Sequence, residues 1–376
     1  MTVLRSIELR EITLPLREPF QISSGTTTQR RILLLELTDR DGLSVWSECV
    51  AGERPNYAPE TIDVAWVVLR EYVAPRVLGT EITDPIDAAH LLGRDFRGHL
   101  MARAAVEMGL WALEAVRTGV PLARLIGGER ERIEVGVSIG IQPDPDTLAA
   151  KAAARLAEGY RKIKLKVKPG ADLEWVRAVR AALGPEAPLM VDANNAYTLG
   201  DSPILEALDG LGLVMIEQPL AWDDLVQHAE LQRRLRTPLC LDESITGLDR
   251  ARDMVTLGSG RIINIKPGRV GGFGPSIAIH DFCRGRSIPV WCGGMLESGV
   301  GRAYNVALAS LPGFTIPGDI SPSARYWERD IVTPEWVMDE QGTMAVPRSE
   351  PGLGVGVDRD RIEDLTVRTE RLTGPA

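Results

Sequence analysis

Lysine is concentrated in one short stretch of this sequence. Only six lysines occur in 376 residues, against 37 arginines, and four of the six alternate with apolar residues between Lys162 and Lys168. A period of two is typical of a strand that presents ammonium groups on one face and apolar side chains on the other. A desolvated lysine can lose its proton and act as a base, whereas an arginine stays charged. The stretch is therefore either a basic edge strand with solvated charges or part of a site that needs a neutral amine.

Charged residues recur at the ends of successive apolar runs. Starting from Lys166 they follow at steps of 26, 25, 25 and 24 residues, and they are Asp192, Glu217, Asp242 and Lys266. Each step has the length of one strand-helix unit, which predicts an α/β fold. Eight such runs favour a TIM-like barrel over an open doubly wound sheet, and in a barrel the charges share the C-terminal rim. The candidate strands are 134–139, 162–167, 189–192, 213–217, 239–242, 262–266, 289–291 and 314–316.

The charges of three lysines and three carboxylates sum to zero, so these residues could simply neutralise one another in a buried network; they are Lys164, Lys166, Lys266, Asp192, Glu217 and Asp242. Desolvating six ions is a poor way to stabilise a fold, so function is the better explanation. Carboxylates from separate strands suit Mg²⁺, or Mn²⁺ or another divalent ion in its place. If a substrate carboxylate lies beside the cation, removal of the proton on the adjacent carbon forms an enediolate. A lysine on each face would allow removal and return of that proton from opposite sides.

The N-terminal part of the chain predicts a smaller domain. Alternating stretches at 3–16, 31–38 and 43–50 indicate an antiparallel meander, and helical periodicity follows at 59–75, 84–93 and 99–118. The connections 17–26 and 51–57 are expected to be loops that cover something, because solvated linkers would not explain Phe20 and Tyr57. We expect a capping domain at 1–125, a barrel at 126–320, and a segment at 321–376 that packs back on the capping domain.

Composition excludes several classes of partner. A net charge of −9 argues against nucleic acid and against an anionic membrane surface, so a small-molecule carboxylate is expected as the substrate. The four cysteines lie far apart without a C-x-x-C pair and are expected to be reduced thiols. There is no signal-like N-terminus and no apolar run of about 18 residues, so we expect a cytoplasmic location.

The ordered motifs between Lys164 and Pro267 resemble the muconate-lactonizing subgroup of the enolase superfamily. They are Lys-x-Lys, Asp-Ala-Asn, Ile-Glu-Gln-Pro, Asp-Glu-Ser and Asn-Ile-Lys-Pro. Enzymes of this superfamily use a Lys or His base together with Mg²⁺ that stabilises an enediolate. Within the subgroup, segments 218–224, 290–299 and 325–328 are similar to the N-acylamino acid (N-succinylamino acid) racemase and o-succinylbenzoate synthase family.

The resemblance implies a TIM-like (β/α)7β barrel with an N-terminal α+β capping domain completed by the C-terminal tail. It implies a homo-oligomer, an octamer in this family, and a Mg²⁺ cofactor. By the same resemblance Lys166 and Lys266 are the acid/base pair, and the metal ligands are Asp192, Glu217 and Asp242. Residues implied to contact the substrate are Lys164, Ser138, Asn194, and Phe20 and Tyr57 in the two cap segments.

Two positions near the later strands carry weaker hypotheses. In Gly293-Gly294-Met295, the backbone N–H groups of Gly294 and Met295 could approach a substrate oxygen, or the glycines could simply form a tight strand-to-helix turn. Arg269 follows Lys266 by three residues and could lower the pKa of that lysine, although a surface arginine is the simpler interpretation.

The resemblance leaves more than one activity open. Racemisation of N-acyl or N-succinyl amino acids and dehydration of a menaquinone precursor to o-succinylbenzoate share one intermediate. Another cycloisomerase or epimerase of the subgroup is an alternative, and so is a non-catalytic anion-binding barrel with a structural cation. Mandelate racemase-like enzymes pair a His after the seventh strand with an Asp on the sixth. Here the sixth strand carries Lys266, and the nearest histidine, His280, lies in a helical run, so that chemistry is disfavoured. Dipeptide epimerases hold the substrate amine with an Asp-x-Asp at the eighth strand. Here that motif is replaced by Asp319-Ile320-Ser321, which suits an acylated nitrogen.

Overall fold

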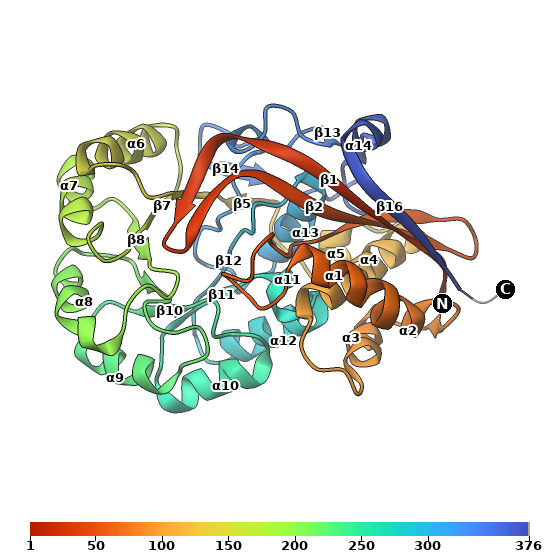
Figure 1. Ribbon diagram of the computed structural model, residues 1–376, viewed down its shortest axis with the longest axis horizontal. Coiled ribbons are helices and arrows are strands. Elements are labelled where there is room, and N and C mark those ends of the chain that lie inside the picture. Colours follow the sequence, from red (N-terminus) through yellow and green to blue (C-terminus); the bar gives the residue numbers. More distant parts are fainter. Residues whose placement is uncertain (375–376) are drawn as a thin grey trace.

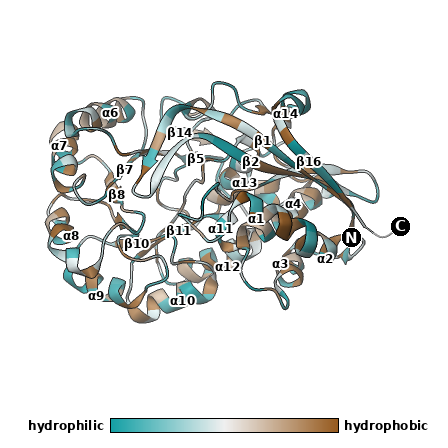
Figure 2. Cartoon of the chain, viewed as in Figure 1, coloured by the Kyte–Doolittle hydropathy of each residue, from teal (hydrophilic) through white to brown (hydrophobic). Residues whose placement is uncertain are grey.

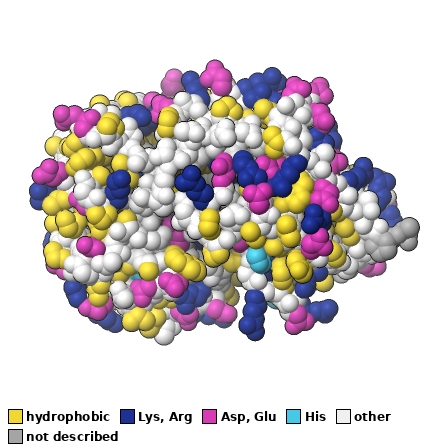
Figure 3. Space-filling model, viewed as in Figure 1, with side chains coloured by type: hydrophobic (Ala, Val, Ile, Leu, Met, Phe, Trp, Pro, Cys, Tyr) yellow, Lys and Arg dark blue, Asp and Glu magenta, His cyan; other side chains and the backbone are white. Residues whose placement is uncertain are grey.

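The computed structural model describes residues 1–374, which form a barrel and a capping domain packed over it (Figure 1). The barrel lies on the left of the view, and the two termini lie beside each other on the right. Acidic and basic side chains are interspersed over the face seen in Figure 3. No helix of the described residues is long and apolar enough to cross a membrane. The domain boundaries given above stay a prediction.

The barrel contains seven parallel strands that follow the chain order. Figure 2 shows hydrophobic residues along them and mixed colours on the surrounding helices, which is the pattern of helices with one face on the barrel. The strands are β6 (Gly136–Ile139), β7 (Lys162–Lys166), β8 (Leu189–Asp192), β9 (Ile216–Glu217), β10 (Leu239–Leu241), β11 (Ile262–Ile265) and β12 (Val290–Cys292). The helices are α6 (Pro145–Ala157), α7 (Leu173–Leu183), α8 (Ser202–Asp209), α9 (Val226–Arg234), α10 (Leu248–Leu257), α11 (Pro267–Val270), α12 (Phe273–Arg284) and α13 (Gly299–Ala309).

The eighth strand predicted at 314–316 does not form as a regular strand. Instead Phe314 pairs with Val290 of β12, and Gly318 pairs with Val135 next to β6, so the segment still closes the ring. Pro317 lies between the two bridges and has no N–H to donate, which interrupts a continuous ladder.

The lysine strand is buried on both faces. Lys162, Lys164 and Lys166 point into the barrel and are exposed by only 1%, 3% and 8%. The interpretation of this stretch as a solvated basic edge strand is therefore wrong. Both neighbours of β7 are barrel strands, so its second face lies against the surrounding helices rather than water.

The capping domain is an antiparallel sheet with helices on one side. Its strand order is β16-β1-β2-β3, so the C-terminal strand completes the sheet that the first strands begin. The strands are β1 (Thr2–Ile22), β2 (Gly25–Asp39), β3 (Ser44–Cys49) and β16 (Thr366–Thr373), and β4 (Glu81–Ile82) pairs with β1. The helices are α1 (Ile62–Val68), a π-helical turn (Leu69–Val73), α2 (Ala74–Val77), α3 (Pro85–Gly93), α4 (Leu100–Thr118) and α5 (Leu122–Leu125).

The tail returns to both domains on its way to β16. Its strand β14 pairs with β5 at the start of the barrel domain, and β13 pairs with β15. These elements are β5 (Arg132–Glu134), a 3-10 turn (Ser323–Arg325), β13 (Val332–Thr333), β14 (Thr343–Ala345), β15 (Gly356–Val357) and α14 (Arg359–Leu365). All four cysteines are buried and unpaired.

The segment 17–26 is not the loop that the sequence predicted. Strands β1 and β2 continue through it as a hairpin that pairs as far as Ile22 and Gly25. Phe20 and Ile22 line a cavity at the barrel mouth, so the expectation that the segment covers something is confirmed. Within the segment only Phe20 and Ile22 alternate with polar residues, so the strands follow from pairing across the hairpin rather than from a run of residues with a strong strand preference.

Three buried glutamates of the capping domain cap the N-termini of helices. Glu60 accepts from the N–H groups of Met101 and Ala102 in α4. Glu107 accepts from Phe273 and Gly274 in α12, and Glu48 accepts from Gly301 in α13. The last two contacts join the capping domain to barrel helices. Burial raises the pKa of Glu48 to about 8 and that of Glu107 to about 7.

Because the native state keeps the Glu48 proton to a higher pH than the unfolded chain does, it binds more protons between about pH 4.5 and 8. The free energy of unfolding should therefore fall as the pH rises through this window. We expect Glu48→Gln, which resembles the protonated acid, to flatten the decrease in Tm by a few degrees. Thermal unfolding from pH 5 to 9 measures this. Glu328→Gln, at a side chain that is 87% exposed, is the matched control and should follow the unmodified protein.

Candidate active site

Lys166 and Lys266 lie across the barrel from each other. Lys166 ends β7, the second strand of the ring, and Lys266 follows β11, the sixth. In a closed ring of eight positions these strands are diametrically opposed. Asp192, Glu217 and Asp242 stand at the ends of the three strands between them. The predicted order of charges around the rim is therefore realised, and all five side chains are buried.

On the Lys166 side, Asp192 is shared between two lysines, and Glu217 contacts one of them. Lys166 Nζ lies 2.6 Å from Asp192 Oδ2, and Lys164 Nζ lies 3.2 Å from the same oxygen and 3.1 Å from Glu217 Oε2. Burial opposes ionisation of Asp192, but the two lysines hold its pKa below the ordinary range. Burial, together with the charge of Asp192, raises the pKa of Glu217. The pKa of Lys166 is lowered, chiefly by burial.

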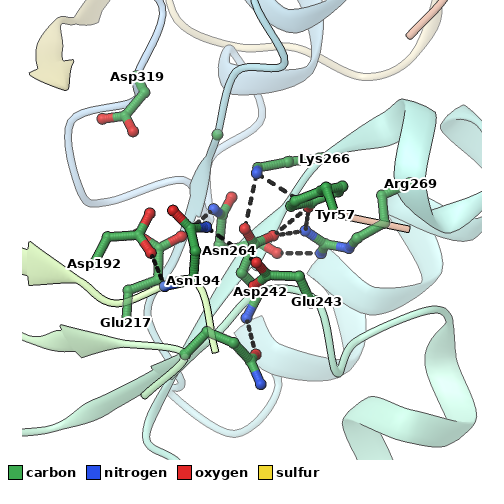
Figure 4. A network of polar contacts seen from close by, with 12 residues as sticks. Tyr57, Asp192, Asn194, Glu217, Asp242, Glu243, Asn264, Lys266, Arg269 and Asp319 are labelled. Carbon is green, nitrogen blue, oxygen red and sulfur yellow. Dashed lines mark hydrogen bonds and ion pairs between the residues drawn. The ribbon is translucent and has the colours of Figure 1, made fainter. Parts of the chain in front are cut away.

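Lys266, Tyr57 and Arg269 converge on Asp242 from another side (Figure 4). Lys266 Nζ lies 2.8 Å from Asp242 Oδ2 and donates to the Tyr57 hydroxyl at 3.1 Å. Tyr57 donates to Asp242 Oδ1 at 3.0 Å. Burial opposes the charged form of Lys266, yet its partners raise its pKa above the ordinary value. The segment around Tyr57 thus reaches into the charged rim from the capping domain.

Arg269 is not a surface residue, so the simpler interpretation made from the sequence was wrong. Its side chain is buried and forms an ion pair with Asp242. It also donates to the carbonyl oxygens of Ile245 at 2.9 Å and Asn264 at 2.5 Å. A turn of helix α11 begins directly after β11, and this carries Arg269 back under the rim.

Asn194 connects the Lys166 side to a further buried acid. It accepts from Lys166 Nζ at 2.7 Å and donates to Glu243 Oε1 at 3.0 Å. Asn194 adopts a left-handed backbone (φ 41°), which is uncommon outside glycine but tolerated by asparagine. Burial raises the pKa of Glu243 to about 7, and the charge of Asp192 adds to the shift.

A cavity of about 320 Å³ opens above these charges beneath the capping domain. Its wall includes both lysines and most of the predicted substrate-binding residues: Phe20, Tyr57, Lys166, Asn194, Lys266, Gly294 and Met295. Lys164 and Ser138 do not line it. They face each other in the β6–β7 register, and Ser138 Oγ is buried without a hydrogen-bond partner among the described residues.

The glycines at 293 and 294 are required for close packing. A Cβ on Gly293 would lie 2.5 Å from the Asn264 side chain and 2.6 Å from Cε of Lys266, and one on Gly294 would lie 2.7 Å from the Asp319 carbonyl oxygen. Helix α13 begins only at Gly299, so the segment is more than a tight strand-to-helix turn. The side chain of Lys266 passes through the space that Gly293 leaves.

Three residues that were not predicted as site residues complete the network. Asp319 lies 2.5 Å from Lys164 Nζ and 3.3 Å from Lys162 Nζ, and Lys162 also stacks over the Trp291 ring at 3.4 Å. Asn264 donates to Glu217 Oε1 at 2.8 Å. The sequence could have predicted two of these residues. Lys162 shares the strand face of Lys164, and Asp319 follows the eighth apolar run.

The donor set fits a hard divalent cation. Asp192, Glu217 and Asp242 supply only carboxylate oxygens, and Glu243 Oε2 is buried without a hydrogen-bond partner. As the side chains stand, no three acidic, His or Cys residues within 1–374 form a metal-binding cluster. The three carboxylates do not converge on one point because each of them faces a cationic side chain.

Comparison with known proteins identifies the family. Residues 5–127 match the mandelate racemase/muconate lactonizing enzyme N-terminal domain, and residues 147–361 match the enolase C-terminal domain-like family. An o-succinylbenzoate synthase from Geobacillus kaustophilus is 50% identical over 95% of this chain and 94% of its own length. The chain belongs to the enolase superfamily. Within it, the chain is a member of the o-succinylbenzoate synthase and N-succinylamino acid racemase family of enzymes.

Two further relatives agree with this placement. An N-succinylamino acid racemase from Thermus thermophilus is 49% identical over 94% of both chains. A solved structure of an enolase-superfamily member from Listeria innocua has a TM-score of 0.95 at 38% identity and covers 99% of this chain and 100% of that one. Relatives named for the two activities are thus similar to this chain to the same degree. The expected TIM-like barrel with its N-terminal cap is confirmed.

Asp319→Asn should strongly destabilise the fold, because Lys162 and Lys164 would lose the carboxylate that they share. Removing one partner from a buried ion pair costs about 3–5 kcal/mol. Chemical denaturation with a fixed m-value measures the loss. Asp249→Asn removes an ion pair at a side chain that is 91% exposed, and should leave the unfolding midpoint close to that of the unmodified protein. Equal midpoints for both variants would contradict the assigned role of Asp319.

Proposed function

We propose that this protein enolises a carboxylate substrate with Lys166 and Lys266 as opposed acid/base groups, acting as an N-succinylamino acid racemase, an o-succinylbenzoate synthase, or both. The observation that carries the proposal is the placement of the two lysines. They come from strands that face each other across the barrel, and both residues line one cavity. A substrate carbon held between them can lose a proton to one lysine and regain it from the other.

The remaining charged residues support the assignment of Lys166 and Lys266 as the acid/base pair. Asp192, Glu217 and Asp242 are the residues that would hold Mg²⁺, and the ion when bound would stabilise negative charge that develops on a substrate carboxylate. Each lysine already contacts one of these carboxylates. The contacts position the amines beside the place where the acidic carbon would lie. Lys164, set deeper, adds positive charge to the same region.

Both candidate reactions need the same first step. Abstraction of the proton next to a carboxylate leads to racemisation if the proton returns to the other face, and to dehydration if a leaving group departs from the next carbon. The capping hairpin and the Tyr57 segment line the cavity from the capping side, where they would help to exclude water from the charged intermediate. The similarity to relatives of both names is equal support for both activities.

Metal removal should abolish turnover. The three carboxylates would then lack the cation that we propose they bind, and excess EDTA should reduce the rate to background, with Mg²⁺ or Mn²⁺ restoring it. Titration calorimetry should show that Asp192→Asn, Glu217→Gln and Asp242→Asn each weaken Mg²⁺ binding by about 10-fold or more. Asp249→Asn should bind Mg²⁺ as the unmodified protein does. Full activity in excess chelator would refute the metal assignment.

Arginine in place of either lysine should stop racemisation. It keeps the positive charge but cannot become a neutral base, so we expect a loss of roughly 10²–10⁴-fold in Lys166→Arg and in Lys266→Arg. Proton NMR of N-succinyl amino acids in D₂O measures exchange of the α-proton for each enantiomer. Residual exchange should be confined to the enantiomer whose proton faces the lysine that remains.

The same experiment separates catalysis from binding alone. If both variants racemise at the rate of the unmodified protein, the two lysines act only through their charge. If the Mg²⁺-loaded unmodified protein exchanges no proton from N-succinyl or N-acetyl amino acids and does not convert the synthase precursor, a non-catalytic anion-binding barrel becomes the better account. Formation of o-succinylbenzoate without racemisation would assign the synthase reaction alone.

A further inference from the structure

Arg30 is a buried cation whose donors are almost unused. The residue is 6% exposed, and Nε is buried without a hydrogen-bond partner. Its guanidinium makes one long hydrogen bond, from Nη2 to the Val50 carbonyl oxygen at 3.4 Å. In residues 1–374 we find no carboxylate that forms an ion pair with it. A guanidinium carries five N–H donors, so most of its binding capacity is free.

The acidic residues near Arg30 accept hydrogen bonds from other groups and do not pair with it. Glu48 lies close enough to sense the charge of Arg30, but it accepts from the Ser298 hydroxyl and from the Gly301 N–H at the start of α13. Glu60, which lines the same cavity as Arg30, is held by N–H groups of α4. Neither offers an oxygen within hydrogen-bonding distance of the guanidinium. An unpaired buried charge is costly, so its presence needs a reason other than stability.

Arg30 belongs to the wall of the cavity that also contains Lys166 and Lys266. It comes from β2, directly below the hairpin that covers the cavity, whereas the lysines come from the barrel. A substrate in this cavity can therefore meet the Arg30 guanidinium on the capping side in addition to the two barrel lysines. A planar guanidinium binds a carboxylate through two parallel hydrogen bonds, a geometry that a carbonyl or amide oxygen does not match.

We propose that Arg30 binds the terminal carboxylate of a succinyl arm on the substrate, and so selects dianionic substrates over those with a neutral acyl group. This rests on the proposed function and names its substrate class. The two candidate activities then share a requirement, because an N-succinyl amino acid and the o-succinylbenzoate skeleton both carry a four-carbon arm that ends in a carboxylate. One cation on the capping domain serves either substrate.

The test compares an N-succinyl amino acid with its neutral succinamoyl analogue, which has the same length and no terminal charge. A hydrogen bond to a charged group corresponds to roughly 10–100-fold in affinity, so the unmodified Mg²⁺-loaded protein should prefer the succinyl compound by that factor in kcat/KM. In Arg30→Met the ratio should fall to about one. Arg30→Lys should retain part of the preference, since it keeps the charge but loses the planar fork.

Arg54 supplies a matched comparison, because it lines the same cavity but is exposed. Arg54→Met should leave the succinyl preference in place. If Arg54→Met loses the preference and Arg30→Met keeps it, the assignment to Arg30 is overturned. A preference that survives in Arg30→Met, or equal losses on both substrates, would overturn it too. Arg30→Met removes an unpaired buried charge, so its Tm should not fall. Arg30→Gln repeats the test should Arg30→Met fail to fold.

A binding measurement tests the Arg30 site independently of the proposed reaction. Calorimetry with the two compounds reports the same ratio as a ratio of Kd values and needs no turnover. If the unmodified protein binds the succinyl compound more tightly, and Arg30→Met does not, the carboxylate site stands even where no proton is exchanged. If the unmodified protein turns over both compounds without discrimination, the reaction stands and the Arg30 site falls.

Discussion

Charge compensation inside the barrel is the constraint on which the rest of this structure depends. Lysine and carboxylate side chains can be buried together only if each charge has a partner close by, because the cost of leaving water is not otherwise recovered. Here the partners are shared: Asp192 serves Lys164 and Lys166, and Asp319 serves Lys162 and Lys164. Sharing ties adjacent strands together at their C-terminal ends. It also holds the amines in defined places, which acid/base chemistry requires.

The capping domain extends this constraint to the other side of the cavity. Tyr57 reaches from it to Lys266 and Asp242, and its buried glutamates hold the first turns of barrel helices. A helix N-terminus exposes N–H groups that need acceptors, and these carboxylates supply them from a different domain. The cavity is therefore framed by two domains that are locked together through polar contacts. Its shape depends on both, as does any selection of substrate by Arg30.

Local patterns were sufficient for much of the site. The spacing of Lys166, Asp192, Glu217, Asp242 and Lys266 predicted one rim because each step equals one strand-helix unit, and the chain order of the strands is also their spatial order. Failures occurred where local and tertiary preferences disagree. The segment 17–26 reads as a loop by its Pro, Gly and Ser content, yet pairing with β2 makes it a hairpin. The eighth strand reads as regular, yet Pro317 reduces it to bridges.

The sequence by itself determined which charges the barrel holds, on which strands, and in what order around the ring, since these follow from residue type and from period along the chain. Only the tertiary structure decided which partner each charge has. Asp319 meets Lys162 and Lys164 because the ring closes, Arg269 turns inward because a short helix follows β11, and Arg30 is left unpaired because its neighbours cap helices. Periodicity fixes the face on which a side chain lies, but distances between residues far apart in the chain depend on closure of the barrel and docking of the cap.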